Sequence, residues 1–152
     1  MGAILILSAL AAAQAASAET AETVFACSFG ARRVEIVRDG GRLTYRFGRP
    51  GRPELVLAGD AASGTLFYHR TVYARGEDQT LRFTSGDFSY VIFNGWSGPN
   101  RSLEGARDDS GLLVLRGGRV IRRMTCREGG DFLENPLFFT LPQDADNLAP
   151  GS

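Results

Sequence analysis

Short stretches of alternating apolar and polar residues run along most of the chain, the spacing that places one side of an extended strand in a core. The clearest example spans 42–47, where Leu43, Tyr45 and Phe47 alternate with Arg and Thr. No helical periodicity separates these stretches, so a parallel βαβ sheet is not expected. The pattern predicts an all-β, antiparallel domain of about eight strands. Besides 42–47, the segments expected to form them are 25–29, 34–36, 55–57, 66–74, 81–83, 88–92, 112–115 and 120–126.

Turn residues punctuate these segments. Glycine adopts the positive φ that tight hairpins need, which predicts turns at 39–41, 85–87 and 117–118. Proline and glycine at 48–53 predict a loop, and a longer polar loop is expected at 94–109, with Trp96 in it. Two acidic pairs, Glu77-Asp78 and Asp108-Asp109, are also interpreted as turns.

Two cysteines, Cys27 and Cys126, flank the β region. An isolated pair in an oxidising compartment usually forms a disulfide. Redox catalysis would call for a C-x-x-C motif, and a zinc cluster for more ligands than the one histidine, His69. A bond between the first and last strands favours closure, which removes exposed edges. We therefore predict a small antiparallel β-barrel or closed sandwich with one disulfide, and no metal or cofactor.

The N-terminus has the features of an export signal. Residues 3–13 are apolar and Ala16-Ser17-Ala18 fits a signal peptidase site, although no Lys or Arg precedes the apolar stretch. We predict a signal peptide at 1–18 cleaved near Ala18, a β-domain at 19–130 and a C-terminal tail at 131–152. No stretch reaches the roughly 20 apolar residues of a membrane helix. A periplasmic or secreted bacterial protein is expected.

The tail has its own pattern. Six apolar residues, with Pro136 among them and Pro142 after them, predict an irregular or short-helical segment; they are Phe132, Leu133, Leu137, Phe138, Phe139 and Leu141. This cluster either packs on the β-domain or docks a partner, in which case the protein has a structural or assembly role. Residues 143–152 are expected to be disordered.

Charge is balanced overall but not locally. The chain has no Lys, and residues 24–127 hold all 17 Arg against 10 acidic residues, a net charge of +7. Such a domain could bind an anionic envelope ligand such as lipopolysaccharide or an acidic glycan; nucleic acid is not expected. Alternatively, the arginines form a solvated face, paired across strands.

No catalytic constellation is evident. His69 lies in an expected strand without a nucleophile elbow, so it is interpreted as a strand residue with a hydrogen-bond partner. The acidic pairs are adjacent in sequence and point apart in an extended chain, unlike the facing carboxylates of a glycosidase. We predict a non-enzymatic protein. The alternative is an enzyme that uses His69 with a nearby acid.

One region resembles a known family. Residues 61–68, Ala-Ala-Ser-Gly-Thr-Leu-Phe-Tyr, followed by 72–81, are similar to the central region of the periplasmic and membrane-bound inhibitors of C-type lysozyme. The resemblance implies an exported β-barrel, with Phe25-Ala26-Cys27 near its start and Cys126 at its end. It also implies a loop whose Ser and Tyr enter the lysozyme cleft. Here that loop is one residue longer, so Phe67 takes the Tyr position.

A second loop, at 85–88, is similar to the Ser-Gly-x-Tyr loop of invertebrate-type lysozyme inhibitors, with Phe88 in place of Tyr. We therefore expect an exported binding module of the bacterial envelope. It would either inhibit a lysozyme-like hydrolase through its loops or hold an anionic ligand through its arginines. The candidate loop residues are Ser63, Gly64, Phe67, Tyr68, Ser85, Gly86, Phe88 and Trp96.

Overall fold

A computed structural model of the chain describes residues 20–98, 107–132, 135–146 and 148. The predicted signal peptide at 1–18 lies outside them. Within the described residues the chain forms ten strands and one 3₁₀ helix, so the all-β prediction is confirmed and the number of about eight strands is wrong. The elements are β1 (Glu22–Ser28), β2 (Arg33–Asp39), β3 (Arg42–Arg49), β4 (Arg52–Gly59), β5 (Leu66–Tyr73), β6 (Gly76–Ser85), β7 (Phe88–Ser97), β8 (Arg107–Arg116), β9 (Arg119–Thr125), β10 (Glu128–Gly129) and η1 (Pro136–Thr140).

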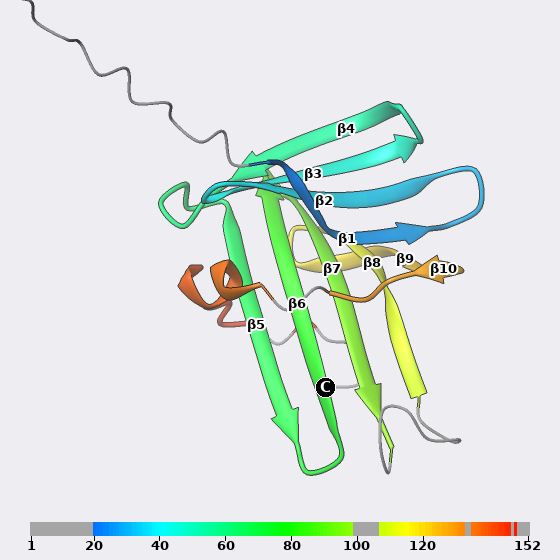
Figure 1. Cartoon of the computed structure of the whole chain (residues 1–152), viewed down its shortest axis with the longest axis vertical. Coiled ribbons are helices and arrows are strands. Elements are labelled where there is room, and N and C mark those ends of the chain that lie inside the picture. Colours follow the sequence, from blue (N-terminus) through cyan, green and yellow to red (C-terminus); the bar gives the residue numbers. More distant parts are fainter. Residues whose placement is uncertain (1–19, 99–106, 133–134, 147, 149–152) are drawn as a thin grey trace, which may run out of the picture.

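The strands form two antiparallel sheets. The first sheet has the order β10-β1-β2-β3-β4 and the second the order β5-β6-β7-β8-β9. The first sheet lies across the upper part of the second, and the lower halves of β5 to β8 extend beyond it (Figure 1). One end of the second sheet is therefore left uncovered by the first.

The predicted barrel is wrong, because the two sheets are not closed into one. The chain leaves the first sheet at Gly59 and enters the second at Leu66, and β4 and β5 form no ladder. Gly59 is buried where the chain turns: a Cβ there would lie 2.9 Å from the Ser63 Oγ. Edges remain, and the edge strand β5 is partly covered by the tail, since Tyr68 pairs with Gln143.

The core lies between the sheets and follows the alternation of the sequence. Ile36, Leu43 and Tyr45 enter it from the first sheet and are fully buried. The Tyr45 ring centroid lies 5.7 Å from that of Phe83 and 5.5 Å from that of Tyr90, both in the second sheet. Because strand side chains alternate between faces, Arg42 and Arg46, next to Leu43 and Tyr45, point outward and are exposed.

The predicted disulfide is confirmed. Cys27 of β1 bonds to Cys126, which directly follows β9, with their Cα atoms 5.4 Å apart. Beyond it the chain crosses from the second sheet to the first: the Arg127 N–H donates to the Ser28 carbonyl (2.9 Å), and β10 pairs with β1. The disulfide thus stands at the point where the chain joins the two sheets.

The glycine hairpins at 40–41, 86–87 and 117–118 are confirmed, whereas three polar segments were misinterpreted as turns or loops. Glu77 and Asp78 lie in β6, Trp96 lies in β7, and Asp109 lies in β8. Glu77 pairs with Trp96 across the ladder. The strands therefore extend beyond the apolar pattern, because ladder hydrogen bonds hold polar residues in extended conformation as well as apolar ones. The expected loop at 48–53 narrows to Pro50 and Gly51 between β3 and β4.

The tail packs against the domain. Its 3₁₀ helix is capped by Asn135, whose side-chain oxygen accepts from the Leu137 N–H (3.0 Å). Phe138 and Leu141 are buried in the core, while Phe139 is 63% exposed. The expectation of disorder from 143 onward is wrong for 143–146 and 148: the Asp144 N–H donates to the Tyr68 carbonyl (2.8 Å), and Asp144 is buried.

Candidate functional site

The two Ser-Gly turns of the predicted binding loops come together. Ser63 and Gly64 precede β5, and Ser85 and Gly86 follow β6, at the same end of the second sheet. The Thr84 N–H donates to the Thr65 carbonyl (2.9 Å), which joins the two connections. The Ser63 hydroxyl donates to the Asp60 carbonyl (2.9 Å) and so holds the first turn in shape.

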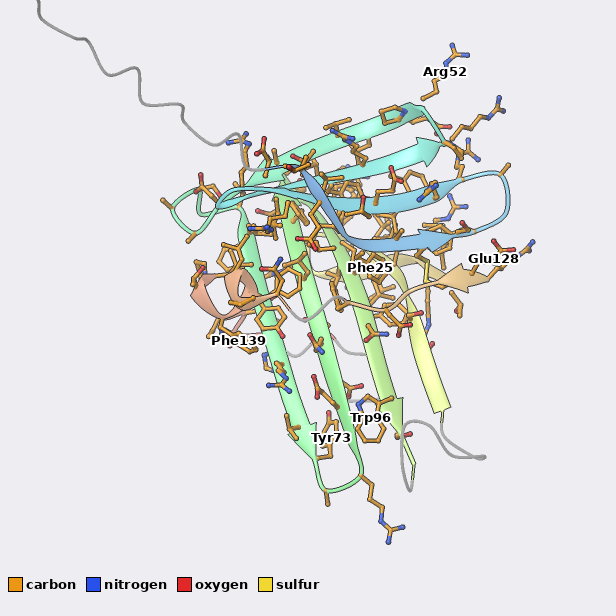
Figure 2. The ribbon with its side chains drawn as sticks, viewed as in Figure 1. Phe25, Arg52, Tyr73, Trp96, Glu128 and Phe139 are labelled. Carbon is orange, nitrogen blue, oxygen red and sulfur yellow. A yellow bond between two sulfur atoms is a disulfide. The ribbon has the colours of Figure 1, made fainter. Side chains whose placement is uncertain are left out.

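The aromatic residues of the same prediction are dispersed. Tyr68 is only 2% exposed; its hydroxyl donates to the Gln79 Oε1 (2.9 Å), and burial raises its pKa to about 12. Phe67 lies under the Arg82 guanidinium, 4.9 Å from the ring centroid. Phe88 stacks on Tyr90, with centroids 6.4 Å apart. Trp96 lies at the opposite end of the second sheet from the Ser-Gly turns (Figure 2).

His69 has a partner at each ring nitrogen, as its interpretation as a strand residue predicts. Nδ1 lies 3.1 Å from the Asp144 carbonyl oxygen and Nε2 lies 2.8 Å from the Thr71 hydroxyl. Among the described residues no group of three or more His, Cys, Asp and Glu side chains could hold a metal ion. The same part of the chain contains no helix long and apolar enough to cross a membrane.

A pocket of about 170 Å³ on the outer face of the first sheet gathers several arginines and is here called the arginine pocket. It is lined by residues of β2, β3 and the β3–β4 hairpin, namely Arg33, Glu35, Arg46, Phe47, Gly48, Arg49, Gly51 and Pro53. Arg52, at the tip of the hairpin (Figure 2), lines an adjoining shallow depression together with Arg49. Three arginines thus face one glutamate, with a fourth arginine beside them.

A bulge at Gly48 shapes this pocket. The register of β3 against β4 shifts between Phe47 and Gly48, and Gly48 has a φ of 148°. A Cβ there would lie 2.5 Å from the Glu54 backbone nitrogen, so only glycine lets the two strands approach so closely. Bulges bend a strand and increase its twist. Gly48 therefore sets the direction in which the arginines at the end of β3 leave the sheet.

The arginines of the pocket differ in their partners. Arg33 is paired with Glu35 (2.6 Å), yet its Nε is buried without a hydrogen-bond partner in the described structure. Arg46, Arg49 and Arg52 form no ion pair with any acidic group in the described part of the chain. Guanidinium groups bind phosphate, sulfate and carboxylate through parallel hydrogen bonds. The pocket therefore has the chemistry of an anion site.

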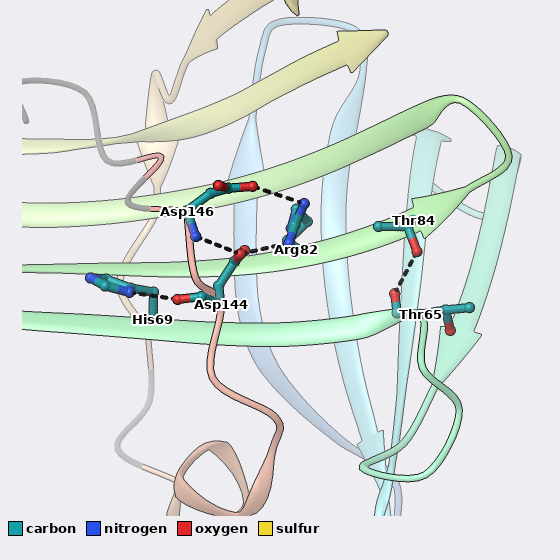
Figure 3. Close-up of polar contacts among 6 residues, drawn as sticks. All are labelled: Thr65, His69, Arg82, Thr84, Asp144 and Asp146. Carbon is teal, nitrogen blue, oxygen red and sulfur yellow. Dashed lines mark hydrogen bonds and ion pairs between the residues drawn. The ribbon is translucent and has the colours of Figure 1, made fainter. Parts of the chain in front are cut away.

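Elsewhere several arginines are paired across strands, as the alternative interpretation of the charge predicts. Arg38 pairs with Glu22 (3.3 Å), and Arg123 with Asp109 (2.9 Å). Arg82 pairs with Asp144 (2.6 Å) of the tail, on the outer face of the second sheet (Figure 3). The interpretation as a paired, solvated face thus holds for these arginines, whereas Arg46 and Arg49 of the arginine pocket have no such partner.

The arginine pocket was not predicted from the sequence. Arg46 was assigned to a solvated strand face and Arg49 and Arg52 to a loop, and nothing in the spacing placed Arg33 of another strand beside them. A signal was nonetheless present: four arginines fall within 42–52, and no acidic residue occurs from 40 to 53.

Comparison of the chain with protein-family models, with curated proteins and with solved structures gave no match.

Proposed function

We propose that the protein is an exported binding module of the bacterial envelope that holds an anionic group of its ligand in the arginine pocket. The observation that carries this proposal is that Arg46 and Arg49 at the pocket, and Arg52 in the adjoining depression, have no acidic partner in the described structure. The ligand group is a phosphate, sulfate or carboxylate. Export is supported by the disulfide, because such bonds persist in oxidising compartments.

Binding of the mature protein to immobilised lipopolysaccharide tests this function. The double variant Arg46→Ala/Arg49→Ala is expected to weaken binding at least tenfold, which corresponds to about 1.4 kcal/mol. The matched control is Arg119→Ala/Arg122→Ala, which removes the same charge from β9, away from the pocket. Wild-type affinity should fall as salt rises from about 50 to 500 mM, since salt screens exposed charges.

Equal losses in the two double variants would show general attraction to the basic domain rather than a site, and affinity indifferent to salt would rule out arginine-driven binding. Competition with inorganic phosphate, sulfate and acetate separates the possible ligand groups. The group that displaces lipopolysaccharide at the lowest concentration is the one that the pocket prefers.

A second candidate function is inhibition of a lysozyme-like hydrolase, and one observation favours it. The two Ser-Gly turns, from segments that each resemble an inhibitor loop, lie side by side and are joined by the Thr84–Thr65 hydrogen bond. In this version Ser63 and Ser85 would enter the cleft of the enzyme, since Tyr68 is buried. A lysozyme assay tests it: full lysozyme activity in micromolar excess of the protein would reject inhibition, and loss of inhibition in Ser63→Trp would locate it.

A further inference from the structure

A second pocket, of about 150 Å³, lies where the tail meets the edge of the second sheet. It is lined by residues of β5, β6 and the segment around η1, namely Tyr68, Arg70, Glu77, Gln79, Asn135, Phe138 and Phe139. We call it the tail pocket. Its one arginine and one glutamate form a two-point ion pair, from Arg70 Nε (2.8 Å) and Nη2 (3.0 Å) to Glu77. Unlike the arginine pocket, it therefore has no excess charge among its lining side chains.

A chain of hydrogen bonds forms the polar side of the tail pocket. The Tyr68 hydroxyl donates to the Gln79 Oε1 (2.9 Å), and the Gln79 Nε2 donates to the Glu77 Oε1 (2.6 Å). Each group orients the next, and burial keeps the Tyr68 hydroxyl protonated by raising its pKa to about 12. The polar side is thus held in one arrangement before any ligand arrives.

Two amides on this polar side retain unused donors. Gln79 uses one of its two amide N–H groups toward Glu77. Asn135 accepts from the Leu137 N–H through its oxygen, and its own N–H₂ group has no partner among the described residues. A side-chain amide carries two N–H donors. The pocket therefore offers N–H donors to a ligand that brings hydrogen-bond acceptors such as a carbonyl oxygen.

The other side of the tail pocket is aromatic. Phe138 stacks on Tyr68 with ring centroids 5.4 Å apart, and Phe139 meets Tyr68 edge-on at 6.1 Å. Phe139 is 63% exposed although it is a large apolar side chain. A ring held at the mouth of a pocket can cover the apolar face of a ligand.

The same sheet face continues past the pocket to Trp96. Paired residues of neighbouring strands point to the same face, and Glu77 pairs with Trp96 on one side and with Val72 on the other. The first sheet does not reach this end (Figure 1), and Tyr73 and Trp96 mark it in Figure 2. Glu77 and Gln79 of β6 form a polar strip on this face. Phe139 of the tail lies on one side of the strip and Trp96 of β7 on the other.

We propose that the tail pocket binds one N-acetylhexosamine residue of a neutral glycan chain, a site independent of the anion site proposed above. A pyranose ring has an apolar face that covers an aromatic ring, and hydroxyl groups at its edge that match a fixed polar network. The acetamido carbonyl supplies the acceptor for the unused N–H groups of Gln79 and Asn135. Absence of excess charge selects a neutral sugar over an acidic one. The next sugar of the chain extends along the polar strip toward Trp96.

Titration with chitotetraose, followed by tryptophan fluorescence and calorimetry, tests this site. Trp96 is the only tryptophan of the chain, so the fluorescence signal reports this face directly. A saturable change in fluorescence is expected. Phe139→Ala and Gln79→Leu should each weaken the affinity about five- to tenfold. Maltotetraose, which lacks the acetamido group, should bind at least tenfold more weakly than chitotetraose.

The matched control is Tyr73→Ala, which removes a similarly exposed aromatic side chain (46% exposed) from the other face of β5 and should leave the affinity unchanged. No saturable signal and no heat at about 10 mM chitotetraose would overturn the proposal, as would equal affinity for maltotetraose. Loss of binding in Tyr73→Ala equal to that in Phe139→Ala would also overturn it. Thermal melts establish that each variant is folded. Arg46→Ala/Arg49→Ala should keep chitotetraose affinity, so failure of this site and failure of the anion site can be told apart.

Discussion

The outer faces of the two sheets both carry arginines, but their surroundings differ. On the second sheet, Arg82 is covered by the tail: its side chain is 19% exposed, and the side chain of its partner Asp144 is 0% exposed (Figure 3). On the first sheet, no segment of the described chain places an acidic group on Arg46 or Arg49. An arginine is thus paired at position 82 of the second sheet and left without an acidic partner at positions 46 and 49 of the first.

This difference explains the unequal distribution of charge along the sequence. The acidic tail folds back onto the basic domain, where Asp144 and Asp146 both pair with Arg82. The charge of these two residues is therefore used inside the molecule, on the second sheet. In and beside the first sheet, Arg32, Arg33 and Arg38 pair with glutamates. Arg46 and Arg49 do not, and this is the reason that the arginine pocket, rather than the whole basic domain, is the candidate anion site.

The largest expected effect on stability comes from removing the disulfide. This tests whether the two sheets, and so both outer faces, need the bond in order to stay folded together. Cys27 and Cys126 are 99 positions apart, and the chain-entropy model assigns about 4.7 kcal/mol to a loop of roughly 100 residues. Cys27→Ser/Cys126→Ser should lose about 4 kcal/mol of unfolding free energy in urea denaturation. A loss below about 1 kcal/mol would mean that the sheets hold together without the bond.

Removal of Asp144 should destabilise the contact between the tail and the outer face of the second sheet, and leave the arginine pocket intact. Asp144→Ala leaves Arg82 without its near partner, and breaking a buried ion pair costs about 3–5 kcal/mol. Since Arg82 is partly exposed, we expect about 3 kcal/mol in urea denaturation. Asp146→Ala is the control: its carboxylate is 65% exposed and lies 3.6 Å from Arg82, so it should cost below about 0.5 kcal/mol. Equal effects of the two substitutions would contradict a structural role for the buried pair.

Gly48→Ala should distort the β3–β4 bulge and with it the arginine pocket. The added Cβ meets the backbone of β4, and the φ of 148° disfavours any side chain; we expect a loss of about 2 kcal/mol together with weaker lipopolysaccharide binding. Gly117→Ala is the control, because this residue lies in the β8–β9 hairpin, outside the arginine pocket. Its Cβ would have open space and only the positive φ disfavours it, at about 1 kcal/mol. Unchanged lipopolysaccharide binding in a folded Gly48→Ala variant would show that the bulge does not shape the arginine pocket.

Alkaline pH should weaken the core without discharging the arginine pocket. Burial raises the pKa of Tyr45 and of Tyr68 above the ordinary value of 10.0, that of Tyr68 to about 12. The folded state thus retains protons that the unfolded state loses, so this stability is complete below pH 10 and is lost as pH rises toward 12. Each group removes up to about 1.4 kcal/mol per pH unit in that range, whereas arginine stays charged. Melting temperatures at pH 8, 10 and 11 check this, and Tyr68→Phe should flatten the profile.

The smallest effect on stability is expected from a substitution within the arginine pocket itself. Arg46→Ala removes an exposed side chain without an ion pair, so its unfolding free energy should change by no more than about 0.5 kcal/mol. Urea denaturation beside the lipopolysaccharide assay measures both quantities on one sample. A large loss of unfolding free energy would show that Arg46 supports the fold, as Arg82 does through its pair with Asp144.

The sequence by itself determined the local structure. Alternation at 42–47 and glycine pairs at 40–41 and 117–118 specify strands and hairpins, because side-chain direction and positive φ are properties of neighbouring residues. The same logic failed at Glu77 and Trp96, which lie in strands although their surroundings are polar. There a partner strand supplies the hydrogen bonds, and no local pattern reveals the partner.

The pairing of Cys27 with Cys126 also followed from the sequence, because the chain contains only these two cysteines. Only the tertiary structure decided that the strands form two separate sheets, that the tail covers Arg82, and that Arg33 and Arg46 share a pocket with Arg49. These are contacts between residues distant along the chain, fixed by how the two sheets pack and where the tail docks. The number of arginines could therefore be read from the sequence, but which of them are paired and which are unpaired could not be predicted from it.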